Sequence, residues 1–154
     1  FKHQLRIGVV GHITYEKGGK ILQSLADEIK KRGSDAKIII LGELREGDLD
    51  KAVMEETGSY KRDELPVLIS RYRPNVFLFP SIIPETFSYV IHELMALDLP
   101  IACFDVGAQA EYLSNYHNGY ILKSKNPGYI LDALYELHKK FWLWRGGRSV
   151  KRQN

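Results

Sequence analysis

The sequence has little cysteine and no long apolar run. Its single cysteine, Cys103, lies inside the apolar stretch LPIACF, which favours a buried, reduced thiol over a nucleophile or a disulfide partner. No apolar run approaches the roughly 18 residues that cross a bilayer, and the first residues, FKHQLRIGVV, lack an initiator methionine and a signal-peptide pattern. We therefore expect a cytoplasmic domain that is cut from a larger protein.

Common cofactor and catalytic motifs are also missing. The segment GHITYEKGGK does not complete the G-x-G-x-x-G fingerprint, and Thr14 and Ile21 stand where a P-loop needs Gly and Ser or Thr. His92 and Glu93 begin like H-E-x-x-H, but Ala96 occupies the position of the second histidine. No G-x-S-x-G elbow is present. We predict no nicotinamide cofactor, no P-loop and no zinc.

Positive charge is concentrated at the C-terminal end. The formal net charge of +3 is too small to indicate nucleic acid, but six basic residues and no acidic one follow from Lys139 onward, mixed with aromatic residues in KKFWLWRGGRSVKRQN. Two explanations stay open: a helix end that packs on a partner domain and leads into a disordered tail, which we favour, and contact with an anionic membrane surface. We divide the chain into a domain at 1–140 and a basic helix end and tail at 141–154.

Apolar strands alternate with amphipathic helices along the chain. The patterns predict strands in LRIGVVGH, AKIIILGE, PNVFLFPS, LPIACFDVG and NGYILK, the last of them edge-like. They predict helices around ILQSLADEI, in DELPVLISRY, from Thr86 to Leu97, in AQAEYLSNY and in PGYILDALYELHKKFWLW.

The strand composition indicates the fold class. The runs KIIIL and VFLF are apolar on both faces, which is typical of a parallel sheet covered on both sides, whereas an antiparallel α+β fold would show polar alternation. We predict an α/β domain with a doubly wound, Rossmann-like parallel sheet. Ligands in this class bind beyond the carboxyl ends of the strands, so the loops after Val10, Leu41, Pro80 and Asp105 are candidate binding loops.

One of these loops carries two glutamates, Glu85 and Glu93, eight positions apart. A helical rise of about 1.5 Å per residue separates them by roughly 12 Å, which is more than the roughly 5 to 9.5 Å between two carboxylates that act on one glycosidic bond. They are better placed to accept hydrogen bonds from hydroxyl groups at the two ends of an elongated ligand. The structural alternatives are a helix-terminus acid for Glu85 and a solvated acid for Glu93.

The start of the same helix suits an anion. The backbone N–H groups of Thr86, Phe87 and Ser88 and the positive end of the helix dipole would lie between the two carboxylates, where they fit a diphosphate. Lys17, on the loop after the first strand, would reach the same crevice. For Lys17 the alternative is a solvated lysine on the surface of the first helix.

Four segments, in this order and spacing, resemble the C-terminal, donor-binding domain of retaining glycosyltransferases of family 4 (group 1), which have the glycosyltransferase B fold: GHITYEKGGKIL, TGSYKRDELPVLI, PSIIPETFSYVIHELMALDLPIACFDVGAQAE and NGYIL. The resemblance covers about residues 5 to 137, and its most specific part is the E-x7-E motif from Glu85 to Glu93. The PET-SY pattern is similar to that of bacterial O-antigen and other surface-polysaccharide enzymes.

The resemblance implies an enzyme that transfers a sugar from a nucleoside-diphosphate sugar to a saccharide or lipid-linked acceptor, with retention of anomeric configuration and without a metal or other cofactor. Such an active site lies between two domains. The N-terminal domain of the same enzyme is therefore an expected partner, and this chain alone should bind the donor without transferring sugar. The implied location is cytoplasmic, at or near the inner face of the cytoplasmic membrane.

The family pattern also implies roles for individual residues. Glu85 would be the catalytic-site acid that contacts the donor sugar, Glu93 would hold the ribose hydroxyls, and Lys17 would bind the diphosphate. The other implied donor-binding residues supply helix-start amides, close approach to phosphate or the nucleobase site: Thr86, Phe87, Ser88, Gly11, His12, Gly58 and Tyr60.

The sequence departs from the family pattern in a few places. His12 occupies a position where an arginine is usual, and a histidine carries its positive charge only part of the time near neutral pH. Ser88 replaces the usual Gly or Pro, and Ala108 replaces the second glycine of a pair. Glu111 matches an acid of the family that has either a structural or a ligand-binding role.

Two other functions fit the sequence less well. A nucleoside-diphosphate-sugar 2-epimerase has the same two-domain plan, but the further catalytic acids and histidines that it needs are not matched. A non-catalytic nucleotide- or protein-binding module, such as a receiver-like domain, would need a cluster of acids after the first strand, where Glu16 stands alone.

Overall fold

The computed structural model describes residues 3–84 and 89–153, with side chains described as far as residue 143. Strands and helices alternate in the expected order, and the elements are β1 (Arg6–Ile13), α1 (Gly19–Lys31), β2 (Lys37–Leu44), β3 (Met54–Glu56), the 3₁₀ turn η1 (Arg62–Glu64), α2 (Leu65–Tyr72), β4 (Val76–Phe79), α3 (Tyr89–Ala96), β5 (Ile101–Phe104), α4 (Gly107–Ser114), β6 (Gly119–Leu122) and α5 (Pro127–Gln153).

The six strands form one sheet in the order β3-β2-β1-β4-β5-β6. Every adjacent pair in that sheet is parallel. This order places β1 at the centre, with the chain running outward first through β2 and β3 and then through β4, β5 and β6. The prediction of a doubly wound, Rossmann-like sheet is confirmed, and so is the edge position of β6.

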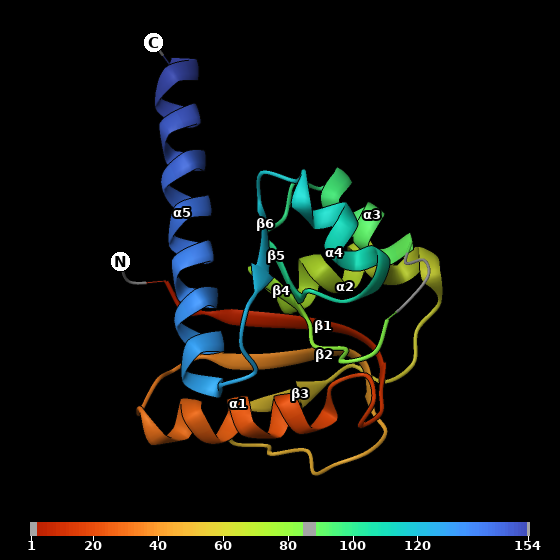
Figure 1. Ribbon diagram of the computed structural model, residues 1–154. Coiled ribbons are helices and arrows are strands. Elements are labelled where there is room, and N and C mark those ends of the chain that lie inside the picture. Colours follow the sequence, from red (N-terminus) through yellow and green to blue (C-terminus); the bar gives the residue numbers. More distant parts are fainter. Residues whose placement is uncertain (1–2, 85–88, 154) are drawn as a thin grey trace.

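Alternate residues of β2, β4 and β5 enter two separate cores. On β2, Ile38 and Ile40 belong to a core with the apolar faces of α1 and α5, while Ile39 and Leu41 belong to a core with α2, α3 and α4. All four side chains are fully buried. Figure 1 shows the resulting arrangement, with α1 and the first turns of α5 on one side of the sheet and α2, α3 and α4 on the other. Burial on both faces explains why the strands lack polar alternation.

Three features differ from the expectation. The edge strand β3 was not predicted, because the segment Met54–Glu56 contains one buried apolar residue followed by two exposed glutamates. The expected helix in DELPVLISRY starts as the turn η1, and α2 itself begins at Leu65. α5 remains helical to Gln153, where a disordered tail was favoured, since the segment after Pro127 has no further proline to end the helix.

The last turns of α5 extend beyond the sheet (Figure 1). Trp142 and Leu143, just past the middle of α5, are exposed, with 40% and 66% of their surface accessible. Across the described residues, no helix combines the length and the apolar character needed to cross a membrane.

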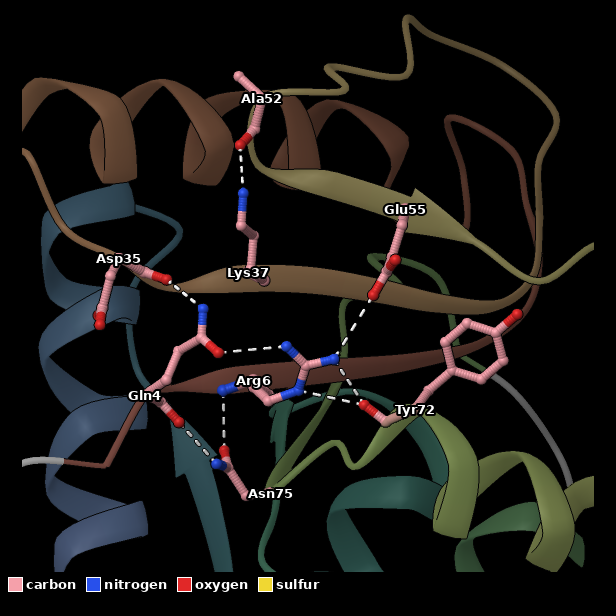
Figure 2. Close-up of polar contacts among 8 residues, drawn as sticks. All are labelled: Gln4, Arg6, Asp35, Lys37, Ala52, Glu55, Tyr72 and Asn75. Carbon is pink, nitrogen blue, oxygen red and sulfur yellow. Dashed lines mark hydrogen bonds and ion pairs between the residues drawn. The ribbon is translucent and has the colours of Figure 1, made fainter.

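A polar network joins the amino ends of the strands to the end of α2 (Figure 2). The guanidinium of Arg6 donates two hydrogen bonds to the carbonyl of Tyr72, at 2.6 and 3.1 Å, and one to Gln4 at 3.2 Å. Asn75 accepts from the Arg6 backbone N–H at 2.8 Å and donates to the Gln4 carbonyl at 2.7 Å. This network ties the start of β1 to the end of α2 and to the residue before β4.

Candidate functional site

Two loops meet beyond the carboxyl ends of β1 and β4. The N–H of Ile82 donates to the carbonyl of Glu16 at 3.2 Å. A Cβ added to Gly18 would lie 2.4 Å from the carbonyl oxygen of Pro80, and Gly18 has a φ of +106°. Only glycine fits this close approach without strain. Because the chain turns outward from β1 in both directions, this junction is the topological switch point, where open α/β sheets bind their ligands.

Two adjoining hollows open at the switch point. The first, which we call the Lys17 hollow, has a volume of about 160 Å³ and is lined by Val10, Gly11, His12, Ile13, Lys17, Phe79, Pro80, Ser81, Val90 and Gln109. The second, the Tyr60 hollow, has a volume of about 170 Å³ and is lined by Val10, Gly11, His12, Gly42, Ser59, Tyr60, Arg62, Tyr89 and Val90. They share the end of β1. An elongated ligand that uses both fits better than a compact one, since a typical ligand pocket holds at least roughly 300 Å³.

The Lys17 hollow offers hydrogen-bond donors and positive charge. Lys17 is exposed at its rim, and its backbone N–H donates to Thr14 Oγ1 at 3.3 Å, which fixes the loop that carries it. Gln109, from the first turn of α4, is only 2% exposed and lines the wall. Among the described lining residues there is no carboxylate. This set of groups is suited to an anion.

An acidic group lies beside the Tyr60 hollow. The hydroxyl of Ser59 donates to Glu43 at the end of β2, and His12 Nδ1 and Arg45 Nε each lie 3.9 Å from a Glu43 oxygen. The hydrogen bond from Ser59, assisted by the charges of Arg45 and His12, holds the pKa of Glu43 below its usual value. Glu43 is therefore an ionised acceptor for the Ser59 hydroxyl, with His12 nearby.

An arginine and two tyrosines form the outer wall of the Tyr60 hollow. Burial, with Tyr89 and Glu93 nearby, raises the pKa of Tyr60 to about 12, so its phenol stays neutral. Arg62 Nε donates to Glu93 Oε1 at 3.2 Å, and its guanidinium carbon lies 3.9 Å from the centre of the Tyr89 ring. Arg62 also borders a larger, mainly apolar hollow of about 570 Å³ between η1, α2 and α3, lined by Arg62, Asp63, Leu65, Pro66, Ile69, Glu93, Ala96 and Leu97.

Residues 1–140 match the family described as Glycosyl transferases group 1. The chain belongs to this family. It has the α/β, Rossmann-like fold of glycosyltransferase B enzymes, as its solved structural neighbours do. Among curated proteins, none matches the sequence.

Several solved structures are similar to this group 1 chain. Anabaena HepE in complex with UDP and glucose has a TM-score of 0.66 at 16% identity, covering 86% of this chain and 38% of its own. The lipopolysaccharide outer core galactosyltransferase WaaB has a TM-score of 0.62 at 17% identity, covering 89% and 40%. Sucrose-phosphate synthase from Thermosynechococcus elongatus has a TM-score of 0.65 at 16% identity, covering 97% and 45%. This glycosyltransferase chain thus spans less than half of each relative, and the likeness shows the shared fold.

The structure brings together part of the predicted donor site of this glycosyltransferase. Gly11 and His12 lie between the two hollows, Lys17 borders one and Tyr60 the other. Gly58 lies next to the Tyr60 hollow, with a φ of +82°, and its N–H donates to the Gly42 carbonyl at 2.9 Å.

The other predicted site residues either line neither of the two hollows or lie outside the described residues. Glu93 borders the larger apolar hollow and approaches the Tyr60 hollow through its ion pair with Arg62. Glu85, Thr86, Phe87 and Ser88 lie outside the described residues. Glu111 is exposed on α4 and does not line either hollow. The roles of all these residues stay predictions.

Sequence reasoning missed several residues that line the site, among them Arg62 and Gln109. Arg62 and Gln109 both stand beside motif residues, in TGSYKRDELP and GAQAE, but neither segment has a spacing that shows which side chain points inward. The described residues contain no group of three or more His, Cys, Asp or Glu side chains arranged to hold a metal ion. Cys103 is fully buried on β5, and burial raises its pKa to about 12, as expected for an inert thiol.

Proposed function

We propose that this chain is the C-terminal, donor-binding half of a retaining glycosyltransferase that acts in the synthesis of a bacterial surface polysaccharide such as O-antigen. The enzyme would take a sugar from a nucleoside diphosphate and transfer it to a saccharide or lipid-linked acceptor. The observation that supports this best is the convergence of Gly11, His12 and Lys17 at the switch point of a group 1 glycosyltransferase domain. Two solved neighbours also support the proposal: HepE, in complex with UDP and glucose, and the lipopolysaccharide outer core galactosyltransferase WaaB.

The donor would lie across both hollows. Its diphosphate would sit at the Lys17 hollow, where Lys17 and His12 supply donors and Gly11 allows close approach of the backbone, and its base would sit at the Tyr60 hollow beside Gly58 and Tyr60. Glu93 would accept hydrogen bonds from the ribose hydroxyls. The helix-start amides of Thr86, Phe87 and Ser88 would complete the diphosphate site, and Glu85 would contact the sugar. In this proposal the protein's own donors bind the diphosphate without a metal.

Two further partners belong to the proposal. The chain spans 38% to 45% of the HepE, WaaB and sucrose-phosphate synthase chains, which supports a second, N-terminal domain that completes the active site. The exposed Trp142 and Leu143, next to Lys139 and Lys140, are suited to peripheral contact with an anionic membrane that carries the acceptor. A cytoplasmic location at the inner face of that membrane follows from the proposal.

Calorimetric titration of the 154-residue chain tests the proposal. We expect one or more of UDP, GDP, ADP, CDP and their sugar conjugates to bind, and Lys17→Ala and Glu93→Ala to weaken binding about tenfold or more each. Lys20→Ala removes the same charge from a neighbouring exposed lysine outside the Lys17 hollow and should leave binding nearly unchanged. No binding across the panel by a folded sample would refute the proposal.

A further inference from the structure

Arg62 is held on the first turns of α3 at two points. Its Nε donates to Glu93 Oε1 at 3.2 Å, and its guanidinium carbon lies 3.9 Å from the centre of the Tyr89 ring. Tyr89 and Glu93 are four residues apart, so they lie above one another on the same face of α3. These two contacts favour one orientation of the guanidinium, although 63% of the Arg62 side chain is exposed.

In this orientation the guanidinium of Arg62 forms part of the wall of the Tyr60 hollow. Nε is its one nitrogen with a hydrogen-bond partner among the described residues, so the donors on Nη1 and Nη2 remain available to a ligand. A guanidinium carries five N–H donors and no acceptor. It therefore stabilises a ligand edge that presents a carbonyl oxygen and disfavours one that presents an amino group.

Two ligand groups could use these donors, a phosphate and a base carbonyl. The ion pair with Glu93 already balances the charge of Arg62, which reduces its attraction for a phosphate but not its capacity to donate to a neutral carbonyl. Lys17 borders only the Lys17 hollow and His12 lies between the two hollows, whereas of these two hollows Arg62 lines only the Tyr60 hollow. Charge and position together favour a base carbonyl over a phosphate as the group to which Arg62 donates.

We propose that Arg62 reads the nucleobase: its guanidinium, held by Glu93 and Tyr89, donates to the carbonyl oxygen at position 4 of a pyrimidine or position 6 of a purine. Uracil and guanine have a carbonyl there, whereas cytosine and adenine have an amino group. The donor class is thus a uridine, thymidine or guanosine diphosphate sugar. This inference rests on the proposed function and narrows its substrate. Glu93 keeps its second oxygen, Oε2, for the ribose, since the described residues make no hydrogen bond to it.

The test compares two matched pairs of ligands by calorimetry on the 154-residue chain: UDP with CDP, and GDP with ADP. Within each pair the phosphates and ribose are identical, so the ratio of the two dissociation constants reports only on the base. One hydrogen bond from a charged donor predicts that the unaltered chain prefers UDP to CDP, or GDP to ADP, by about tenfold or more. In Arg62→Ala this ratio should fall to about one to twofold, because the donor is lost.

Two variants complete the design. Arg62→Lys keeps the charge but lacks the planar fork, and it should retain only part of the preference. Arg71→Ala removes an exposed arginine of α2 that lines neither hollow, and it should keep the preference of the unaltered chain. Thermal melting of each variant confirms that it is folded.

The outcomes separate this inference from the proposed function. If none of the four diphosphates binds the unaltered chain, the proposed function fails and the inference fails with it. If diphosphates bind but Arg62→Ala weakens all four equally, Arg62 contacts the phosphates or acts structurally, and base reading is refuted while the proposed function stands. Tighter binding by Arg62→Ala would likewise refute base reading, because it would show that the Arg62–Glu93 pair obstructs the site.

Discussion

Gly11 and Gly33 form a natural pair for testing where the ligand approaches the backbone. Both have positive φ angles, +124° and +63°, and a Cβ added to either would have no atom within 4 Å. Gly11 lies near the carboxyl end of β1, between the two hollows. Gly33 follows α1, in the turn that leads to the amino end of β2. Both positions therefore have a positive φ, and they differ in their distance from the candidate site.

Alanine at either position should cost stability for the same reason. A non-glycine residue held at such a positive φ costs about 1–3 kcal/mol, and each kcal/mol lowers the Tm of a chain of this size by about 2–4 °C. The consequences for binding should differ. The methyl group of Gly11→Ala would enter open space at the junction of the hollows, where the diphosphate is proposed to lie, and displacing the diphosphate should weaken binding about tenfold or more, or about 1.4 kcal/mol.

The assay pairs thermal melting with calorimetric titration of the tightest-binding nucleoside diphosphate. We expect both variants to melt earlier than the unaltered chain, and only Gly11→Ala to lose affinity. If Gly11→Ala binds as tightly as Gly33→Ala at a temperature where both are folded, the diphosphate does not contact the end of β1 and the placement of the donor is wrong.

Three further predictions concern stability and reactivity. Arg6→Ala, which removes the two hydrogen bonds to the Tyr72 carbonyl, should lower the free energy of unfolding by about 1–3 kcal/mol without changing nucleotide affinity; an unchanged denaturation midpoint would contradict this. Burial, with His3 nearby, lowers the pKa of His138 from 6.5 to about 4, so between these values the unfolded chain binds a proton that the folded chain does not. Stability should fall as the pH falls through this window, by at most about 1.4 kcal/mol per pH unit from this group, and denaturation of His138→Gln should show a shallower dependence than the unaltered chain; equal slopes would contradict it. Cys103, buried and with its pKa raised to about 12, should react with a thiol reagent only on unfolding, and rapid labelling of the folded chain would contradict its placement.

The fold could be predicted from the sequence because its strands are buried on both faces. Runs such as Ile38–Leu41 leave no polar face, and only a parallel sheet between two helical layers accounts for them. The edge strand β3 escaped prediction because its pairing with β2, rather than its own composition, makes it a strand.

The candidate site was predictable where it depends on loops that follow buried strands. Lys17 was expected there because the carboxyl ends of parallel strands meet at one edge, whereas Gly11 and Tyr60 were expected only from the resemblance to the family. Arg62 was not found, since its role depends on contacts with Tyr89 and Glu93, which lie 27 and 31 positions further along the chain. Such contacts are set by how η1 packs on α3, and no local pattern in the sequence encodes them.

The most direct test of the central claim is the location of a bound nucleoside diphosphate, measured by amide chemical shifts of the ¹⁵N-labelled chain during titration with UDP, GDP, ADP and CDP. The account predicts that the ligand that binds shifts the amides of Gly11, Lys17, Tyr60 and Ser81 most, and leaves that of Gly33 nearly unchanged. Saturable shifts confined to another surface, such as the hollow between β6 and α5 around Tyr120 and Leu143, would contradict it, as would the absence of shifts with every ligand.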